Sequence, residues 1–140
     1  MRDLHNSINV KRGLSPVAAV TDNTAFVSQI VDRSGYESCE FVILVGNAGT
    51  GATFACLFED GDAANLSDHA EVAAGNLLGT EALAGFDSTA SNKVFKIGYA
   101  GTKRYCRVTV TPATNTGNAF VAGAWILGGA HNAPTANPPV

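Results

Sequence analysis

Hydrophobic and polar residues alternate along most of the chain, and this two-residue period predicts β-strands rather than helices. The alternating segments are separated by residues that favour turns, chiefly Gly, Asn, Asp and Pro. We expect strands at Ala25–Val31, Cys39–Val45, Thr53–Glu59, Val94–Tyr99, Tyr105–Val110 and Ala119–Leu127. Strands do not alternate with long helical segments, so we do not expect the parallel sheet of an α/β protein.

The same period indicates which side chains form the core. The residues expected to face inward are Cys39, Phe41, Ile43, Val45, Phe54, Cys56, Phe58, Cys106, Val108 and Val110. In the first of these strands the intervening Val42 and Leu44 are also apolar, so we expect that strand to be buried on both faces.

The connections between the segments complete the expected fold. Gly46–Gly51 predicts a hairpin between the strands on either side, and Ala100–Lys103 predicts a second hairpin. Asp68 and Glu71 have capping-box spacing, which predicts a short helix over His69–Ala74, although an irregular excursion fits equally well. The pattern therefore predicts an all-β fold, an antiparallel β-sandwich of jelly-roll-like type with one short helical insertion and extended termini.

A length of 140 residues fits one domain. We expect an extended N-terminal arm over residues 1–20, because Ser15-Pro16 interrupts any strand there, although Ile8–Val10 has the pattern of a sheet-edge segment. The β-sandwich body is expected over residues 21–128. Residues 129–140 are expected to form a Pro-rich extended C-terminal tail, since they contain Pro134, Pro138 and Pro139.

Charged residues are segregated along the chain. All nine charged residues between positions 34 and 92 are acidic, all five between 93 and 107 are basic, and none lies between Val108 and Val140. Exposed surfaces normally carry interspersed charges, so a neutral segment with a strong strand pattern favours a surface covered by other copies or by a partner. The alternative is that Thr, Asn and Ser residues solvate this region. A net charge of −3 with nine dispersed cations does not favour nucleic-acid binding.

Motifs for chemistry are incomplete in this sequence. Gly46–Thr53 has the glycine spacing of a phosphate-binding loop, but Ala52 stands where the lysine is required. Asp60–Asn65 lacks the ligand order of a calcium-binding loop. His5, His69 and His131 stand singly, and zinc needs several convergent ligands. We therefore expect no enzyme, no cofactor and no metal.

The three cysteines, Cys39, Cys56 and Cys106, have no CxxC spacing and lie in apolar segments, so we expect buried free thiols. The chain also has no apolar run near 18–20 residues and no evident leader, so no membrane partner is expected.

Eight segments resemble a family of small proteins encoded in the head-gene region of tailed bacteriophages and prophages. They are Arg2–Val17, Thr21–Thr24, Ser34–Ser38, Phe41–Leu44, Glu59–Ala63, Leu78–Glu81, Gly98–Tyr105 and Val110–Gly117. The resemblance spans nearly the whole chain, but its segments are not catalytic motifs. It implies a structural virion protein similar to capsid decoration, or cement, proteins, which are commonly trimers on the outside of the shell.

This resemblance implies a partner and two kinds of contact. The partner is the phage major capsid protein, and the location is the outer surface of the virion, after assembly in the host cytoplasm. The arm residues expected to contact the capsid are Leu4, Ile8, Val10, Lys11 and Arg12. The residues expected at the interface of a homotrimer are Lys103, Arg104, Arg107, Phe120 and Trp125, with the basic hairpin meeting the acidic block of a neighbour. No nucleic acid or membrane is expected as a partner.

Other functions remain open at this point. Uncharged interfaces also suit a head–tail connector or a tail-tube component. A virion-displayed carbohydrate-binding module would use Trp125 or surface tyrosines, although Trp125 lies in the strongest strand pattern, which favours a position in the core or at an interface. The three cations near Tyr99 and Tyr105 also fit a weak nucleic-acid patch. A small hydrolase would need an acid/base or nucleophile constellation, which the sequence does not indicate.

Overall fold

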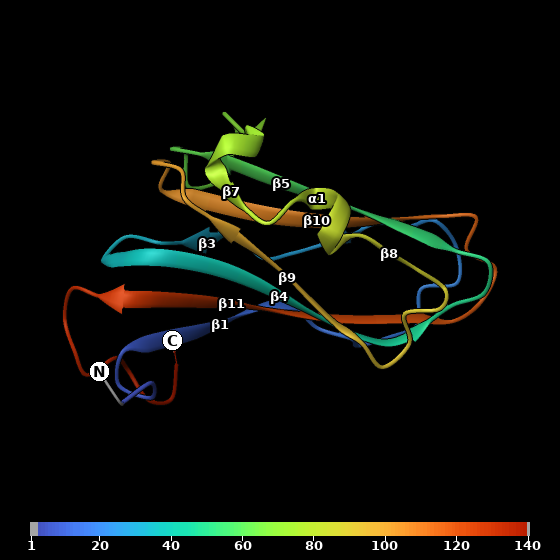
Figure 1. The fold of residues 1–140 in the computed structure, drawn as a ribbon, viewed down its shortest axis with the longest axis horizontal. Coiled ribbons are helices and arrows are strands. Elements are labelled where there is room, and N and C mark those ends of the chain that lie inside the picture. The colour runs from blue at the N-terminus through green and yellow to red at the C-terminus, as the bar shows by residue number, and fades with distance from the viewer. Residues whose placement is uncertain (1–2, 140) are drawn as a thin grey trace.

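The computed structural model describes residues 3–139 and consists of two antiparallel β-sheets packed face to face (Figure 1). Sheet A contains, in spatial order, β1 (Ile8–Leu14), β11 (Ala119–Ala130), β4 (Tyr36–Ala48), β9 (Val94–Tyr99) and β7 (Leu77–Leu78). Sheet B contains β2 (Phe26–Val27), β10 (Tyr105–Ala113), β5 (Thr53–Gly61) and β6 (Ala70–Glu71), with β3 (Val31–Asp32) beside β10 and β8 (Phe86–Asp87) beside β5. The predicted all-β sandwich is confirmed.

The two predicted hairpins are wrong, because each joins strands of different sheets. β4 lies between β11 and β9 in sheet A, whereas β5 pairs with β10 in sheet B. The connections after β4 and after β9 therefore cross from one layer to the other. A two-residue period identifies the side of a strand that faces the core but not the strand beside it, so both pairings fit the same pattern.

The core lies between the sheets and contains the residues expected from the period. All ten of the predicted inward side chains are buried, and Phe41, Ile43, Phe58, Cys106, Val108 and Val110 are completely so. Phe41 packs on Trp125 with ring centroids 4.6 Å apart, and Phe58 stacks on Tyr99 at 5.5 Å. Gly123 lies against the Phe41 ring, since a Cβ there would come within 2.5 Å of Phe41 Cζ.

Burial of β4 on both faces is not observed. Leu44 is 47% exposed and lies on the outer side of sheet A, which no other layer of the chain covers. An apolar residue on the outer side of a two-layer fold is left in contact with solvent unless a partner covers it.

The short helix lies at a different place from the one expected. Asp68 does not cap a helix; its carboxylate accepts the backbone N–H groups of Asp62 and Ala63, and Ala70–Glu71 forms β6. Helix α1 spans Glu81–Ala84, and the Thr80 side chain accepts from Leu83 N. The Asp68 side chain stabilises a turn because short acidic residues bond local backbone groups as readily as helix ends.

The two ends of the chain differ from the extended segments that we expected. Ile8–Leu14 is strand β1, paired with β11 at the edge of sheet A, as the pattern of Ile8–Val10 predicted, so this part of the expected arm belongs to the sandwich. β11 continues through Ala130 into the predicted tail. The residues after Ala130 lie beside the residues that precede β1, since Thr135 N donates to Asn6 O at 3.0 Å. The first and last described residues therefore lie at the same end of the sandwich (Figure 1).

Candidate functional site

The outer face of sheet A is apolar along its central strands. The register places Ala122 beside Leu44 and Ala124 beside Val42, while Leu44 lies next to Val94 on the other side. We call this surface the outer apolar face; it is formed by Val10, Val42, Leu44, Val94, Phe120, Ala122, Ala124 and Ile126. Val10, Leu44 and Val94 are 39%, 47% and 61% exposed, and so much exposed apolar area on one face of a sheet is typical of an interaction surface.

One end of the outer apolar face is hollowed. Pro16, Leu44, Val45, Gly46, Phe120 and Ala122 line a depression of about 440 Å³ whose surface is mostly apolar. The small side chain of Ala122 leaves space between the larger residues Phe120 and Leu44. Such a surface accepts apolar side chains of a partner and releases ordered water as it is covered.

Three charged residues on the same face take no part in ion pairs within the described chain. Arg12 and Lys96 lie at the two sides of the row that contains Ala124 and Val42, and Glu40 lies in the next row. Among residues 3–139, none of the three has an opposite charge within ion-pair distance, and Arg12 donates only to Ser15 Oγ. Their charges are therefore available to a partner.

The outer face of sheet B is different, because most of its charges are paired within the chain; Glu71 on β6, opposite Glu59, has no ion-pair partner among residues 3–139. Arg107 Nη2 lies 2.7 Å from Glu59 Oε2, and His69 Nδ1 lies 2.7 Å from the other oxygen of Glu59. Arg104 pairs with Asp32 through two nitrogen–oxygen contacts of 3.0 and 2.7 Å. The adjacent outward positions on β10 include Thr109 and Thr111, which are polar.

These ion pairs change the interpretation of the basic hairpin. Lys103, Arg104 and Arg107 were expected to meet acidic residues of a neighbouring copy, but each pairs with a carboxylate of its own chain. Lys103 and Arg107 pair with Asp62 and Glu59 of the acidic block within the same molecule, whereas Arg104 pairs with Asp32, which precedes that block. Trp125 is also absent from the surface: it is completely buried, and its indole N–H donates to Gln29 O. Neither an intersubunit contact nor a bound sugar reaches it.

Some of the remaining candidate residues lie at the outer apolar face. Phe120 is half-buried there, and Val10 and Arg12 on β1 project from the same side of the sheet. Ile8 shares their side, Lys11 alternates to the other side, and Leu4 is exposed ahead of the strand. The structure thus joins part of the predicted capsid arm and Phe120 into one surface.

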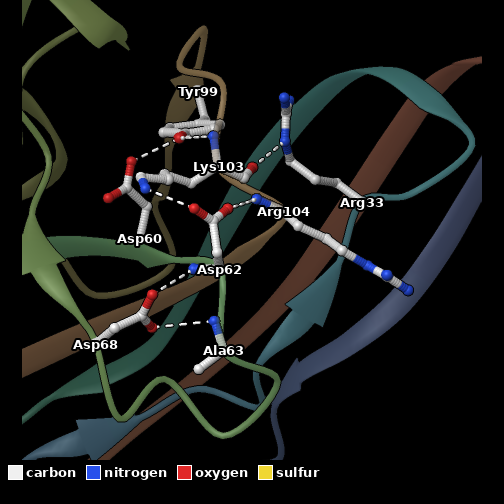
Figure 2. Close-up of polar contacts among 8 residues, drawn as sticks. All are labelled: Arg33, Asp60, Asp62, Ala63, Asp68, Tyr99, Lys103 and Arg104. Atoms are coloured by element: carbon white, nitrogen blue, oxygen red, sulfur yellow. Dashed lines mark hydrogen bonds and ion pairs between the residues drawn. The ribbon is translucent and has the colours of Figure 1, made fainter.

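A polar network occupies the end of the sandwich where β5, β9 and β10 meet (Figure 2). Tyr99 Oη donates to Asp60 Oδ2 at 2.5 Å and accepts from Lys103 N at 3.0 Å. Burial and the bond to Asp60 raise the pKa of Tyr99. Lys103 Nζ lies 2.5 Å from Asp62 Oδ2, and this contact lowers the pKa of Asp62. The network holds the β9–β10 connection in one conformation.

Arg33 also belongs to this network, but its partners are backbone carbonyl oxygens and not a carboxylate. Its Nε donates to Lys103 O at 2.6 Å and its Nη2 to Gly101 O at 2.9 Å. The guanidinium also lies over the Tyr99 ring, 4.9 Å from the centroid. Sequence reasoning missed this residue because its partners are backbone carbonyls about 70 positions away, which leave no local signal.

The cysteines are all free and buried, as expected. Burial raises the pKa of Cys56 to about 12, and a hydrogen bond with Cys39 together with burial raises that of Cys106. Over residues 3–139 no group of three or more His, Cys, Asp or Glu side chains is placed to hold a metal ion. In the same range no helix is long and apolar enough to cross a membrane.

Comparisons with known proteins define the fold rather than a family. No protein-family model matches the chain, and no curated protein sequence does. Among solved structures, the chain is similar to the PBSX exported protein XepA, with a TM-score of 0.53 and 15% identity over 94% of this chain. The chain spans 40% of the length of XepA. At this identity the likeness shows a shared β-sandwich fold.

Two further solved structures are more distant. The CBM35 of Cellvibrio japonicus Abf62 has a TM-score of 0.45 at 15% identity, covering 90% of this chain and 99% of that one. The SPBc2 prophage-derived protein YomS has a TM-score of 0.37 at 12% identity, covering 86% of this chain and 91% of that one. These overlaps are too loose to indicate function.

Proposed function

We propose that the chain is a structural protein of a tailed-phage particle that decorates the capsid and stabilises the DNA-filled head. The observation that carries this proposal is the outer apolar face, where Leu44 and Val94 are exposed side by side on β4 and β9, and Val10 is exposed on β1, on the other side of β11. A surface of this kind lowers its free energy when another protein covers it. The resemblance to small head-region proteins of phages supports the same conclusion.

The arrangement of the face suggests how it is shared in a particle. β1 is the edge strand of sheet A, so Val10 and Arg12 are positioned to contact a capsid subunit beside it. β11 and β4 carry the larger apolar area, which would contact neighbouring copies in a trimer. Arg12 and Lys96 would then meet carboxylates of these partners, because they have none within ion-pair distance in the described chain.

Stabilisation of the head follows from linkage. A protein that binds only the assembled and expanded shell lowers the free energy of that state and opposes separation of its subunits. Repetition over a symmetric lattice adds avidity, so each contact needs only modest affinity. No chemical step is required of the protein in this role.

Imaging of the particle encoded with this gene tests the proposal. We expect density for the sandwich on the outside of the capsid, with sheet A turned toward capsid and neighbouring copies. Particles that lack the protein should keep their tails but lose heat resistance. Absence of the chain from purified particles would overturn the proposal, and loss of tails would instead favour a head–tail connector.

Light scattering of the purified protein provides a second measurement. A mass three times that of one chain supports the trimer, whereas a larger closed ring favours a connector or tail-tube component. Binding to a neutral glycan by a monomer would favour a carbohydrate-binding module and would contradict the structural role.

A further inference from the structure

A small hollow lies next to the polar network, on the side of Arg33. Its lining consists of Arg33, Ser34, Gly35, Tyr36, Thr102, Lys103 and Arg104, and its volume is about 240 Å³. Most of the surface is polar, and three of its side chains are cations. The hollow lies at the end of the sandwich, apart from the outer apolar face.

The cations of this hollow are not equivalent. Lys103 and Arg104 each have a carboxylate within 2.7 Å, whereas Arg33 donates only to the carbonyl oxygens of Lys103 and Gly101. Among residues 3–139, no carboxylate lies within ion-pair distance of Arg33. Figure 2 shows its guanidinium beside Lys103 and turned away from Asp60, Asp62 and Asp68.

The guanidinium of Arg33 is held in place before any ligand arrives. Two carbonyls hold one side of the group, and the Tyr99 ring supports its plane. Tyr99 is itself bonded to Asp60 and to the backbone of Lys103. A planar guanidinium has five N–H groups, so donors of Arg33 remain for a planar pair of oxygens. Little side-chain entropy remains to be lost on binding.

We propose that Arg33 and this hollow bind a small oxyanion, a carboxylate or phosphate group, through the unoccupied guanidinium N–H groups. The exposed Thr102 hydroxyl lies at the same hollow and supplies a further donor. The positive φ of Gly35, +85°, turns the backbone after β3 at the edge of the hollow, and a Cβ there would meet no atom within 4 Å. The site is therefore open from solvent on that side.

Titration of ¹⁵N-labelled protein with inorganic phosphate, at constant ionic strength set with chloride, tests the site. We expect saturable shifts of the Arg33 Nε–H signal and of the Gly35 and Thr102 amides. Titration with glucuronate, with glucose as the neutral control, distinguishes a sugar carboxylate from phosphate. Shifts that increase linearly without saturation for both anions would overturn the proposal.

Substitutions distinguish specific binding at this hollow from nonspecific attraction of anions to the positive charges of the protein. Arg33→Lys keeps the charge but loses the planar pair of donors, so affinity should fall about tenfold. Thr102→Glu leaves the contacts of Arg33 intact and places a negative charge at the hollow, so binding should be lost even if Arg33→Lys fails to fold. Lys93→Met removes an exposed cation just before β9 that does not line the hollow, so it is the matched control and should bind normally. Equal binding by wild type and a folded Thr102→Glu variant would contradict the site.

Discussion

The two outer surfaces of this sandwich meet solvent in different ways. On sheet B, Glu59 is almost completely buried and has both Arg107 and His69 as partners, and Asp32 has Arg104. On sheet A, apolar residues of β1, β4 and β9 are exposed and those of β11 are partly exposed, beside charges that have no ion-pair partner in the described chain. Sheet B thus pairs most of its charges within one molecule, whereas the apolar area and unpaired charges of sheet A are typical of a surface that another molecule covers. Four predictions test this difference.

The largest expected effect on stability comes from comparing an inward and an outward residue of β11. Trp125→Ala removes a completely buried ring from the core and should lower the free energy of unfolding by about 3–5 kcal/mol. Ile126→Ala changes the next residue, which faces outward, and should alter stability by less than about 1 kcal/mol while weakening assembly. Chemical denaturation and light scattering measure the two effects. A stable but assembly-defective Trp125→Ala protein would contradict the assignment of Trp125 to the core.

The second prediction compares matched valines on the two sheets. Val94→Asp puts a carboxylate on sheet A at a residue 61% exposed, and Val27→Asp does so on sheet B at a residue 51% exposed. Covering an unpaired charge is costly, so Val94→Asp should weaken assembly by about 2 kcal/mol, roughly thirtyfold. Val27→Asp should assemble normally in the same light-scattering and particle-binding measurements. The opposite result would assign the interface to sheet B.

The third prediction compares a matched charge with an unmatched one. Arg107→Met leaves Glu59, only 7% exposed, with His69 as its remaining ion-pair partner, and should lower the free energy of unfolding by about 1–3 kcal/mol. Lys96→Met removes no ion pair and should change it by no more than about 0.5 kcal/mol. Urea denaturation of both variants measures the difference. Equal losses would mean that Lys96 has a structural partner in solution.

The smallest effect concerns acid stability. Hydrogen bonds from Arg104 and Lys103 hold the pKa values of Asp32 and Asp62 below the ordinary value of 3.8. These pairs therefore stabilise the fold above that pH, and their contribution is lost as the pH falls through the lower native values. In melting curves between pH 7 and 2, the Asp32→Asn/Asp62→Asn variant should show a shallower fall below pH 4 than the wild type. Parallel curves would exclude a contribution from these pairs.

The inward residues could be predicted from the sequence because a strand places alternate side chains on one face whatever its neighbours are. The pairing of β4 with β9 could not be predicted from the sequence, because it depends on where the chain crosses from one sheet to the other. The capping-box spacing predicted a helix that begins after Asp68, but the Asp68 carboxylate instead accepts the backbone N–H groups of Asp62 and Ala63 in a turn. The neutral C-terminal segment did indicate the apolar side of β11, since its outward residues carry no charge.

The candidate site was predicted less completely. Phe120 could be placed on a surface strand from the pattern, but Trp125 has the opposite parity and belongs to the core. The basic residues Lys103, Arg104 and Arg107 were expected to pair with acidic residues of a neighbouring copy, and each has a carboxylate partner within its own chain. Charge segregation along a sequence shows which residues attract each other, and only the fold determines whether one chain can satisfy the attraction.

The contact between Asn6 and Thr135 has a practical consequence for imaging. Because residues 3–7 and 131–139 lie at the same end of the sandwich (Figure 1), we expect a tag fused to either terminus to project from that end. Two tagged particles, one for each terminus, should therefore show extra density at one position. That position would give the polarity of the sandwich axis relative to the shell without an atomic map.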